Sequence, residues 1–181
     1  GTALGAISAI AMVAFRTVKR WLLPVMVISQ AIPVFALAPI LVLWLGYGIG
    51  SKVAMAVLII FFPVMAAFYD GLRRTEPEWL ELARVMNAPK RGILWQIRVP
   101  AALPALASGL RVAASVAPIG AVVGEWVGAS RGLGFYMLYS SARMQTDVMF
   151  AALALLAIAA LVLYFSVDRL MNHLVYWKSG G

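Results

Sequence analysis

Long runs of uncharged, mostly apolar residues alternate along the chain with short segments that carry nearly all of its charge. A helix needs about 20 mainly apolar residues to cross the roughly 30 Å hydrocarbon core of a bilayer. We therefore expect an all-α protein, a polytopic transmembrane helical bundle in which residues 1–181 form a single domain. The runs predict a partial span at about 1–15 and further spans at about 22–45, 53–69, 104–127 and 148–167.

The first two runs depart from the simplest pattern. Fifteen residues of helix rise only about 22 Å, too short to cross the core, and residues 1–15 lack the basic start of a signal peptide. We therefore expect a fragment that begins inside a transmembrane helix. The second run is too long for one straight crossing, and its prolines Pro24, Pro33 and Pro39 predict a kinked or broken helix. A loop is expected after it, at GYGIGS.

The polar segment 70–103 separates the third span from the fourth. Within it, EPEWLELARVM (76–86) predicts a helix, because Pro77 suits the first turn and acidic residues favour the positive end of the helix dipole. Four apolar residues follow a helical spacing, so one face of this helix needs a partner. They are Trp79, Leu82, Ala83 and Met86.

A turn is expected directly after this helix. Pro89 disfavours helical geometry in the residue before it, and Asn87 is of the non-glycine type that most often adopts the left-handed conformation closing a helix. A second helix is predicted from Pro89 to about Arg98, where Pro100 should stop it. The segment therefore predicts a helix–turn–helix elbow between two spans.

Composition excludes several other classes of protein. The chain is 64% hydrophobic and 12% charged, which is too apolar for a soluble domain of 181 residues. Its net charge of +8 is clustered between apolar runs, so we expect no nucleic-acid partner. With no cysteine and one histidine, no metal site is expected, and an intramembrane enzyme would have little material for catalysis. The chain also lacks a G-x-x-x-x-G-K-[ST] phosphate loop.

Charge also predicts which ends of the spans lie together in the cytoplasm, where lysine and arginine accumulate. The loop at 16–20, segment 70–103 and the C-terminal tail fall on one side and the remaining loops on the other. The first side holds Arg16, Lys19, Arg20, Arg73, Arg74, Arg84, Lys90, Arg91, Arg98, Arg169 and Lys178, and the second holds Lys52, Arg131 and Arg143. The elbow is therefore expected in the cytoplasm.

The elbow carries a recognisable pattern. From Glu81 to Pro100 the sequence reads E-x-A-x-x-x-N-x9-I-x-V-P. It resembles the EAA loop, E-A-A-x-x-x-G-x9-I-x-L-P, of bacterial ABC-importer permeases with the type I fold. The resemblance implies that the elbow is a pair of coupling helices that fits a cleft on the ATPase subunit. Leu82 and Val99 depart from the pattern, as does Asn87 at the glycine position. The implied coupling residues are Glu81, Ala83, Arg84, Asn87, Ile97 and Pro100.

The resemblance extends over nearly the whole chain. IPVFALAPILVLWLGYGIGSK and SGLRVAASVAPIGAVVGEWVGASRGLG look like permeases of the taurine, alkanesulfonate and nitrate importers. VVGEWVGASRGLGFYML, followed by SSARMQTDVMFAAL, looks most like permeases for hydroxymethylpyrimidine, a thiamine precursor.

This resemblance implies a multi-pass permease of the bacterial inner membrane that catalyses no covalent reaction. Its implied partners are an ATP-binding cassette subunit holding ATP and Mg²⁺, a periplasmic or lipid-anchored solute-binding protein, a second permease copy and membrane lipid. A secondary transporter or channel is the rival, although it would not need the elbow and would usually carry more ionisable groups in its spans.

Five residues are candidates for the translocation pathway or its gate, and each also has a structural alternative. Breaks at Pro33 and Pro39 could line a cavity or only shape packing. Gly120 and Gly124, continued by Gly128, form G-x-x-x-G steps that suit either a gate or static helix packing. Glu125 could meet substrate, or could lie at headgroup level beside an aromatic residue.

Arg111 lies too far down the fourth span to reach Glu125, about 21 Å for 14 residues of helix. We expect it to extend toward the cytoplasm or to pair with another segment.

Overall fold

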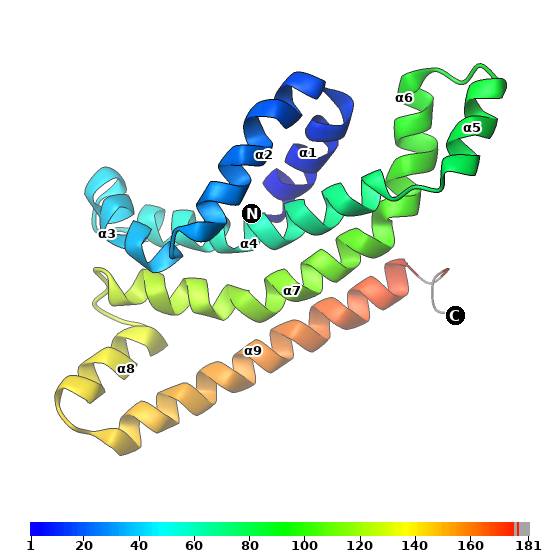
Figure 1. Cartoon of the computed structure of the whole chain (residues 1–181). Helices are drawn as coiled ribbons and strands as arrows, with labels where there is room; N and C mark the ends of the chain where they lie inside the picture. Colours follow the sequence, from blue (N-terminus) through cyan, green and yellow to red (C-terminus); the bar gives the residue numbers. More distant parts are fainter. Residues whose placement is uncertain (176, 178–181) are drawn as a thin grey trace.

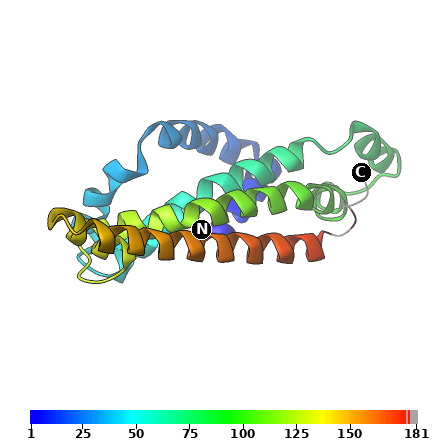
Figure 2. The ribbon, with the colours of Figure 1, turned by 90° about the horizontal axis from the view of Figure 1, so that it is seen from below.

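In a computed structural model of the chain, the structure describes residues 1–175 and 177, and every regular element in this part is a helix. Within these described residues, three helices are long and apolar enough to cross a membrane: α4 (Ile49–Arg73), α7 (Val99–Trp126, preceded without a break by residues 90–98) and α9 (Thr146–Leu174). They run side by side along the molecule (Figures 1 and 2). The predicted all-α membrane fold is confirmed. The shorter helices are α1 (Thr2–Ala14), α2 (Arg16–Ala31), α3 (Val34–Leu45), α5 (Pro77–Val85), α6 (Lys90–Gly92) and α8 (Leu133–Ala142).

The packing of α7 on α4 forms the centre of the molecule and depends on small residues. A Cβ added at Gly109 would lie 2.8 Å from the Ala67 Cβ and 2.9 Å from the Pro63 carbonyl oxygen. A Cβ added at Gly71 would lie 2.5 Å from the Ala105 Cβ. Inside a membrane, where water does not drive helices together, such close backbone approach is a main source of helix association. The α4–α7 pair is therefore the frame on which the other helices are placed.

We expect Gly109→Ala to lower the free energy of unfolding by about 1–3 kcal/mol, because an added methyl group would overpack a contact that involves backbone. Gly50→Ala is the matched control, since a Cβ there meets open space, and its effect should stay within about 1 kcal/mol. Thermal unfolding in neutral detergent would compare the two variants. Equal stability of both would contradict the close approach of α4 and α7.

Helix α1 packs on the other side of α4 and forms the main apolar core with it. Met12 on α1 and Met65, Phe68 and Leu72 on α4 are all nearly inaccessible to solvent. After α1 the chain turns at Phe15, whose backbone is extended (φ −123°, ψ 113°), and returns as α2. Residues 16–20, expected as a loop, are instead the first turns of α2. Figure 1 shows α1 and α2 as a hairpin beside α4.

The predicted break in the run at 22–45 is confirmed. The run is divided into α2 and α3 at Ile32 and Pro33, where the backbone leaves helical geometry, with Ile32 at φ −85° and ψ 120°. Pro33 donates no backbone hydrogen bond and drives the residue before it out of helical geometry. Pro24 and Pro39 remain inside α2 and α3. The predicted GYGIGS loop is also shorter than expected, because α4 begins at Ile49.

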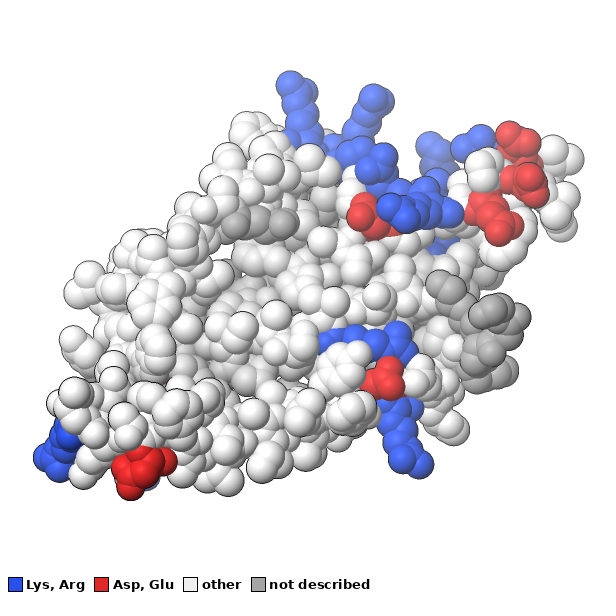
Figure 3. Space-filling model, turned by 60° about the horizontal axis from the view of Figure 1, so that its bottom comes forward, with Lys and Arg blue, Asp and Glu red and all other residues white. Residues whose placement is uncertain are grey.

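The two ends of the long helices differ in character. The elbow formed by α5 and α6 lies at one end together with the C-terminal end of α9, whereas α3 and α8 lie at the other (Figure 1). Lysine and arginine side chains gather beside the elbow, and broad surfaces without charge cover much of the remainder of this face (Figure 3). The start of α2, the elbow and the C-terminal end of α9, which were expected to share the cytoplasmic side, thus lie toward this end of the molecule. Lys178, counted with them, lies outside the described residues.

Candidate functional site

The first helix of the elbow, α5, forms where the sequence predicts it. Pro77 occupies its first turn and Glu78 lies beside it at the N-terminal end, while Arg84 lies in the last turn. These positions complement the helix dipole at both ends. Ala83 is buried and the Glu81 side chain is exposed. Glu81 and Ala83 therefore occupy opposite environments on one short helix.

The turn after α5 is a Schellman motif. The Ala88 N–H donates to the Ala83 carbonyl oxygen at 2.9 Å, and the Asn87 N–H donates to that of Arg84 at 2.9 Å. Both bonds satisfy carbonyl groups that the helix end leaves free. Asn87 has φ +54°, so the predicted left-handed conformation is confirmed. The elbow is therefore closed by its own backbone.

We expect Asn87→Val to destabilise this turn by about 1–2 kcal/mol, because a β-branched side chain is strained at positive φ. Asn87→Gly should leave the turn intact, since glycine adopts this conformation freely. Hydrogen exchange of the amides at 83–88 would report the difference as faster exchange in the valine variant. Equal exchange in both variants would show that the left-handed turn does not hold the elbow.

The predicted stop at Pro100 is wrong. The chain stays helical from Lys90 to Trp126, passing through a π-helical turn, η1 (Ile93–Arg98). The Val99 N–H donates to the Leu94 carbonyl oxygen, five residues back, and Pro100 stands in the first turn of α7. Pro100 has no backbone N–H to donate, and it lies directly after the π-helical turn, where the hydrogen-bonding pattern changes in any case. The helix can therefore continue through it. The elbow is therefore continuous with a long central helix.

The face of α5 that the sequence predicts to need a partner is largely uncovered. Leu82 is 62% exposed and Met86 73%, and Trp79 and Val85 are exposed as well. We call these four residues the elbow face. Exposed apolar clusters of this kind mark interaction sites when they are contiguous. Ala83, expected on the same face, points inward instead.

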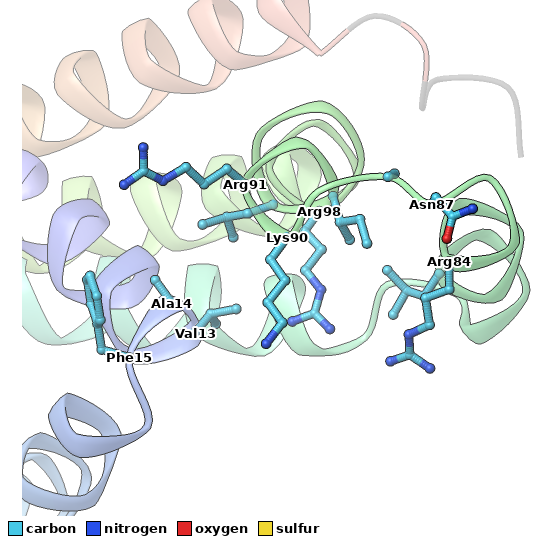
Figure 4. Close-up of a pocket in the computed structure, with 12 residues that line it drawn as sticks. Val13, Ala14, Phe15, Arg84, Asn87, Lys90, Arg91 and Arg98 are labelled. Carbon is cyan, nitrogen blue, oxygen red and sulfur yellow. The ribbon is translucent and has the colours of Figure 1, made fainter.

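A pocket of about 670 Å³ lies between the elbow and the turn that joins α1 to α2. Figure 4 shows Val13, Ala14 and Phe15 on one side of it and basic side chains of the elbow on the other. Sequence reasoning counted these basic residues for orientation but gave no reason to expect them around one cavity. They are Arg84, Lys90, Arg91 and Arg98.

The glycines proposed for a gate lie in the α4–α7 contact. A Cβ at Gly120 would lie 3.2 Å from the Ala56 Cα, and one at Gly124 would lie 3.3 Å from the Lys52 Cα. This position favours the alternative of packing within one chain. Gly128 lies beyond the end of α7 at φ +94°, against the Tyr47 ring, so the second predicted G-x-x-x-G step does not lie on the helix.

Glu125 has a partner within the chain. Its carboxylate accepts a hydrogen bond of 2.6 Å from the Gly134 N–H in the first turn of α8. Helix N-termini have free N–H groups and attract negative charge. Pro33 and Pro39, the remaining pathway candidates, are both exposed. The five candidates are therefore not brought together in one cavity by the described part of the chain.

Arg111 pairs with another segment, one of the two predicted alternatives. Its Nε donates to the Asp168 Oδ1 at 2.5 Å, and its Nη2 donates to the Asn172 Oδ1 at 2.6 Å. Asn172 also donates to the other oxygen of Asp168. The three side chains form a polar clamp between α7 and α9. Sequence reasoning did not select Asp168 or Asn172, and the only local signal was that Asp168 ends the last uncharged run.

Comparison with known proteins now decides the family. The profile of a family described as "Binding-protein-dependent transport system inner membrane component" matches residues 1–178. The chain belongs to this family. It is therefore an ABC transporter permease, as the EAA-like pattern indicated. Proteins of this kind are transport components and not enzymes.

Several curated relatives resemble this permease. A probable ABC transporter permease protein of Haemophilus influenzae is 58% identical over 176 residues, covering 97% of this chain and 72% of the relative. The formylaminopyrimidine transport permease protein ThiX of Halalkalibacterium halodurans is 42% identical, covering 89% of this chain and 64% of the relative. The taurine transport system permease protein TauC of Escherichia coli is 32% identical, covering 89% of this chain and 58% of the relative. This chain thus spans less than two thirds of the length of ThiX and TauC.

Proposed function

We propose that this permease forms the membrane-spanning part of an ATP-driven importer for a small organic solute, in the bacterial inner membrane. The observation that carries this proposal is the elbow face, an uncovered apolar surface on a helix that leads through a closed turn into a long membrane helix. If transport is driven by ATP, these 181 residues, which carry no phosphate loop, must receive the energy from a partner, and such a surface is a physical means of receiving it.

The elbow suits the transmission of motion. The Schellman turn fixes α5 against the start of α6, and residues 90–126 then form one unbroken helix. A displacement of α5 by an ATPase that binds ATP and Mg²⁺ would therefore move α7 directly. In this proposal Glu81 and Arg84 face the ATPase, Ala83 and Asn87 keep the elbow in shape, and Ile97 and Pro100 join it to α7.

The proposed substrate is a pyrimidine precursor of thiamine, such as hydroxymethylpyrimidine or formylaminopyrimidine. Greater identity to ThiX than to TauC supports it, at 42% against 32%. Taurine, an alkanesulfonate or nitrate is the alternative. A solute-binding protein would deliver the substrate from outside, and a second copy of the permease would complete the pathway. Transport then proceeds by alternating access. A secondary transporter or channel is the remoter alternative.

Reconstitution tests the proposal. Proteoliposomes containing the permease and its co-purifying ATPase, with ATP inside and the solute-binding protein outside, should accumulate radiolabelled hydroxymethylpyrimidine. Leaving out the ATPase should abolish uptake. Uptake driven by an ion gradient without the ATPase would overturn the proposal. Preference for taurine under the same conditions would overturn only the assignment of substrate.

A further inference from the structure

The pocket between the elbow and the α1–α2 turn has the dimensions of a binding site. Its volume of about 670 Å³ falls within the range of about 300–1,000 Å³ that is usual for small-molecule sites. One wall is apolar and consists of the last residues of α1 with Phe15. The opposite wall comes from the elbow, so a molecule in this pocket would contact two parts of the fold that are far apart in the sequence.

The elbow wall is strongly positive. Four cations line the pocket, and no acidic residue of the described part of the chain does. Among the described residues, none of these cations has a carboxylate within ion-pair distance. In Figure 4 the ends of Lys90 and Arg98 lie on the same side of the pocket. Like charges held this way repel each other unless an anion lies between them.

Arg98 gives a second indication of a missing partner. Its Nε is buried and has no hydrogen-bond acceptor in the described part of the chain. Buried polar groups are nearly always paired, so an unpaired one needs an explanation. A phosphate oxygen would supply both the acceptor and the opposite charge, and arginine binds phosphate well. The pocket therefore matches a phosphate group better than a neutral solute.

The apolar wall decides between a soluble phosphate and a lipid. It continues into α1, an apolar helix packed on the membrane helix α4, and Phe15 is 63% exposed at its end. Basic pockets beside membrane helices on the cytoplasmic side bind anionic lipid headgroups. We propose that this pocket binds the headgroup of an anionic phospholipid, whose acyl chains run along α1. The proposal rests on the membrane placement of the chain and not on its transport function.

Native mass spectrometry in neutral detergent tests this site, because no charged bilayer surface is present there. The purified permease would be titrated with phosphatidylglycerol and, separately, with phosphatidylcholine. Lys90→Gln/Arg91→Gln is the test variant, since both side chains are exposed and their loss should not disturb folding. Arg74→Gln/Arg169→Gln is the matched control, with the same change in net charge on the same side but outside the pocket.

Wild-type protein and the control variant should retain one phosphatidylglycerol in preference to phosphatidylcholine. The test variant should bind it at least about tenfold more weakly, because each basic residue contributes severalfold to the attraction for anionic lipid. Equal binding of the two lipids, or equal weakening in the two variants, would overturn the proposal. Displacement of the lipid by inorganic pyrophosphate alone would assign the pocket to a soluble anion instead. If the complex of the permease with its ATPase no longer retained the lipid, the proposal would be overturned and the pocket would be assigned to an acidic segment of that partner.

Discussion

Replacing Leu82 and Met86 together by aspartate is expected to abolish co-purification of the ATPase and ATP-driven uptake. Both side chains belong to the elbow face and are mostly exposed in the permease alone, at 62% and 73%. If a partner covers them, the variant would bury two charges without counter-ions. Central apolar residues of an interface contribute about 2 kcal/mol or more each, so affinity should fall at least about 100-fold. Pull-down of the ATPase and uptake by proteoliposomes would measure the two effects.

The matched control is Leu82→Met/Met86→Leu, which changes the same two positions but keeps their size and apolar character. It should bind the ATPase and transport solute like the wild type. Because both positions are exposed but lie at the C-terminal end of α5, where negative charge is unfavourable, the aspartate variant should lose at most about 2 kcal/mol of unfolding free energy and remain folded. A correctly folded aspartate variant with normal uptake would show that the elbow face does not bind the ATPase.

The elbow was predictable because its signals are local. Pro77 and Glu78 mark the start of α5, and Asn87 before Pro89 marks its end. Each acts through backbone geometry or the helix dipole within one or two turns, so no distant contact is needed to recognise them. The break at Pro33 was also predictable from a local signal, because a proline disturbs the helix at its own position and at the residue before it.

Local rules failed where the rest of the fold supplied a compensation. Pro100 should end a helix by its own geometry, but the π-helical turn before it allows the helix to continue. Pro39 also lacks a backbone N–H and should interrupt a helix as Pro33 does, yet it remains inside α3. Gly124 and Gly128 have the spacing of one helix face, yet α7 ends between them. These outcomes depend on neighbouring segments that one stretch of sequence does not specify.

The polar clamp was beyond sequence reasoning for a related reason. Arg111 and Asp168 are 57 residues apart in the chain, and Arg111 alone allowed either a partner or extension toward the cytoplasm. Only the packing of α9 on α7 selects between these alternatives. The clamp is therefore a tertiary feature, and its energetic role can be tested directly.

Asp168→Ala should lower the free energy of unfolding by about 1–3 kcal/mol, because it leaves Arg111 without its counter-ion beside an apolar helix. The side chains of Arg111 and Asp168 are 28% and 32% exposed in the chain alone, so the effect should be smaller than that of a fully buried pair. Thermal unfolding in neutral detergent, together with hydrogen exchange of the α9 amides, would measure it.

Asp147→Ala is the control for this prediction, since Asp147 is exposed in the first turn of the same helix, and its loss should cost at most about 1 kcal/mol. Arg111→Leu/Asp168→Leu should be more stable than Asp168→Ala, because an apolar pair removes the unpaired charge. If the double variant is no more stable than Asp168→Ala, the unpaired charge of Arg111 is not what destabilises the single variant.

The clamp should matter most for α9, the least buried of the three long helices. Only 6% of its most apolar window is buried inside the chain, against 28% for α4 and 33% for residues 90–126. A helix with so little buried surface has few packing contacts to hold its position, so one charged pair carries a larger share of its attachment. Faster exchange in Asp168→Ala should therefore be confined to α9 and leave α4 protected, whereas uniform exchange across both helices would show that the clamp supports the whole fold.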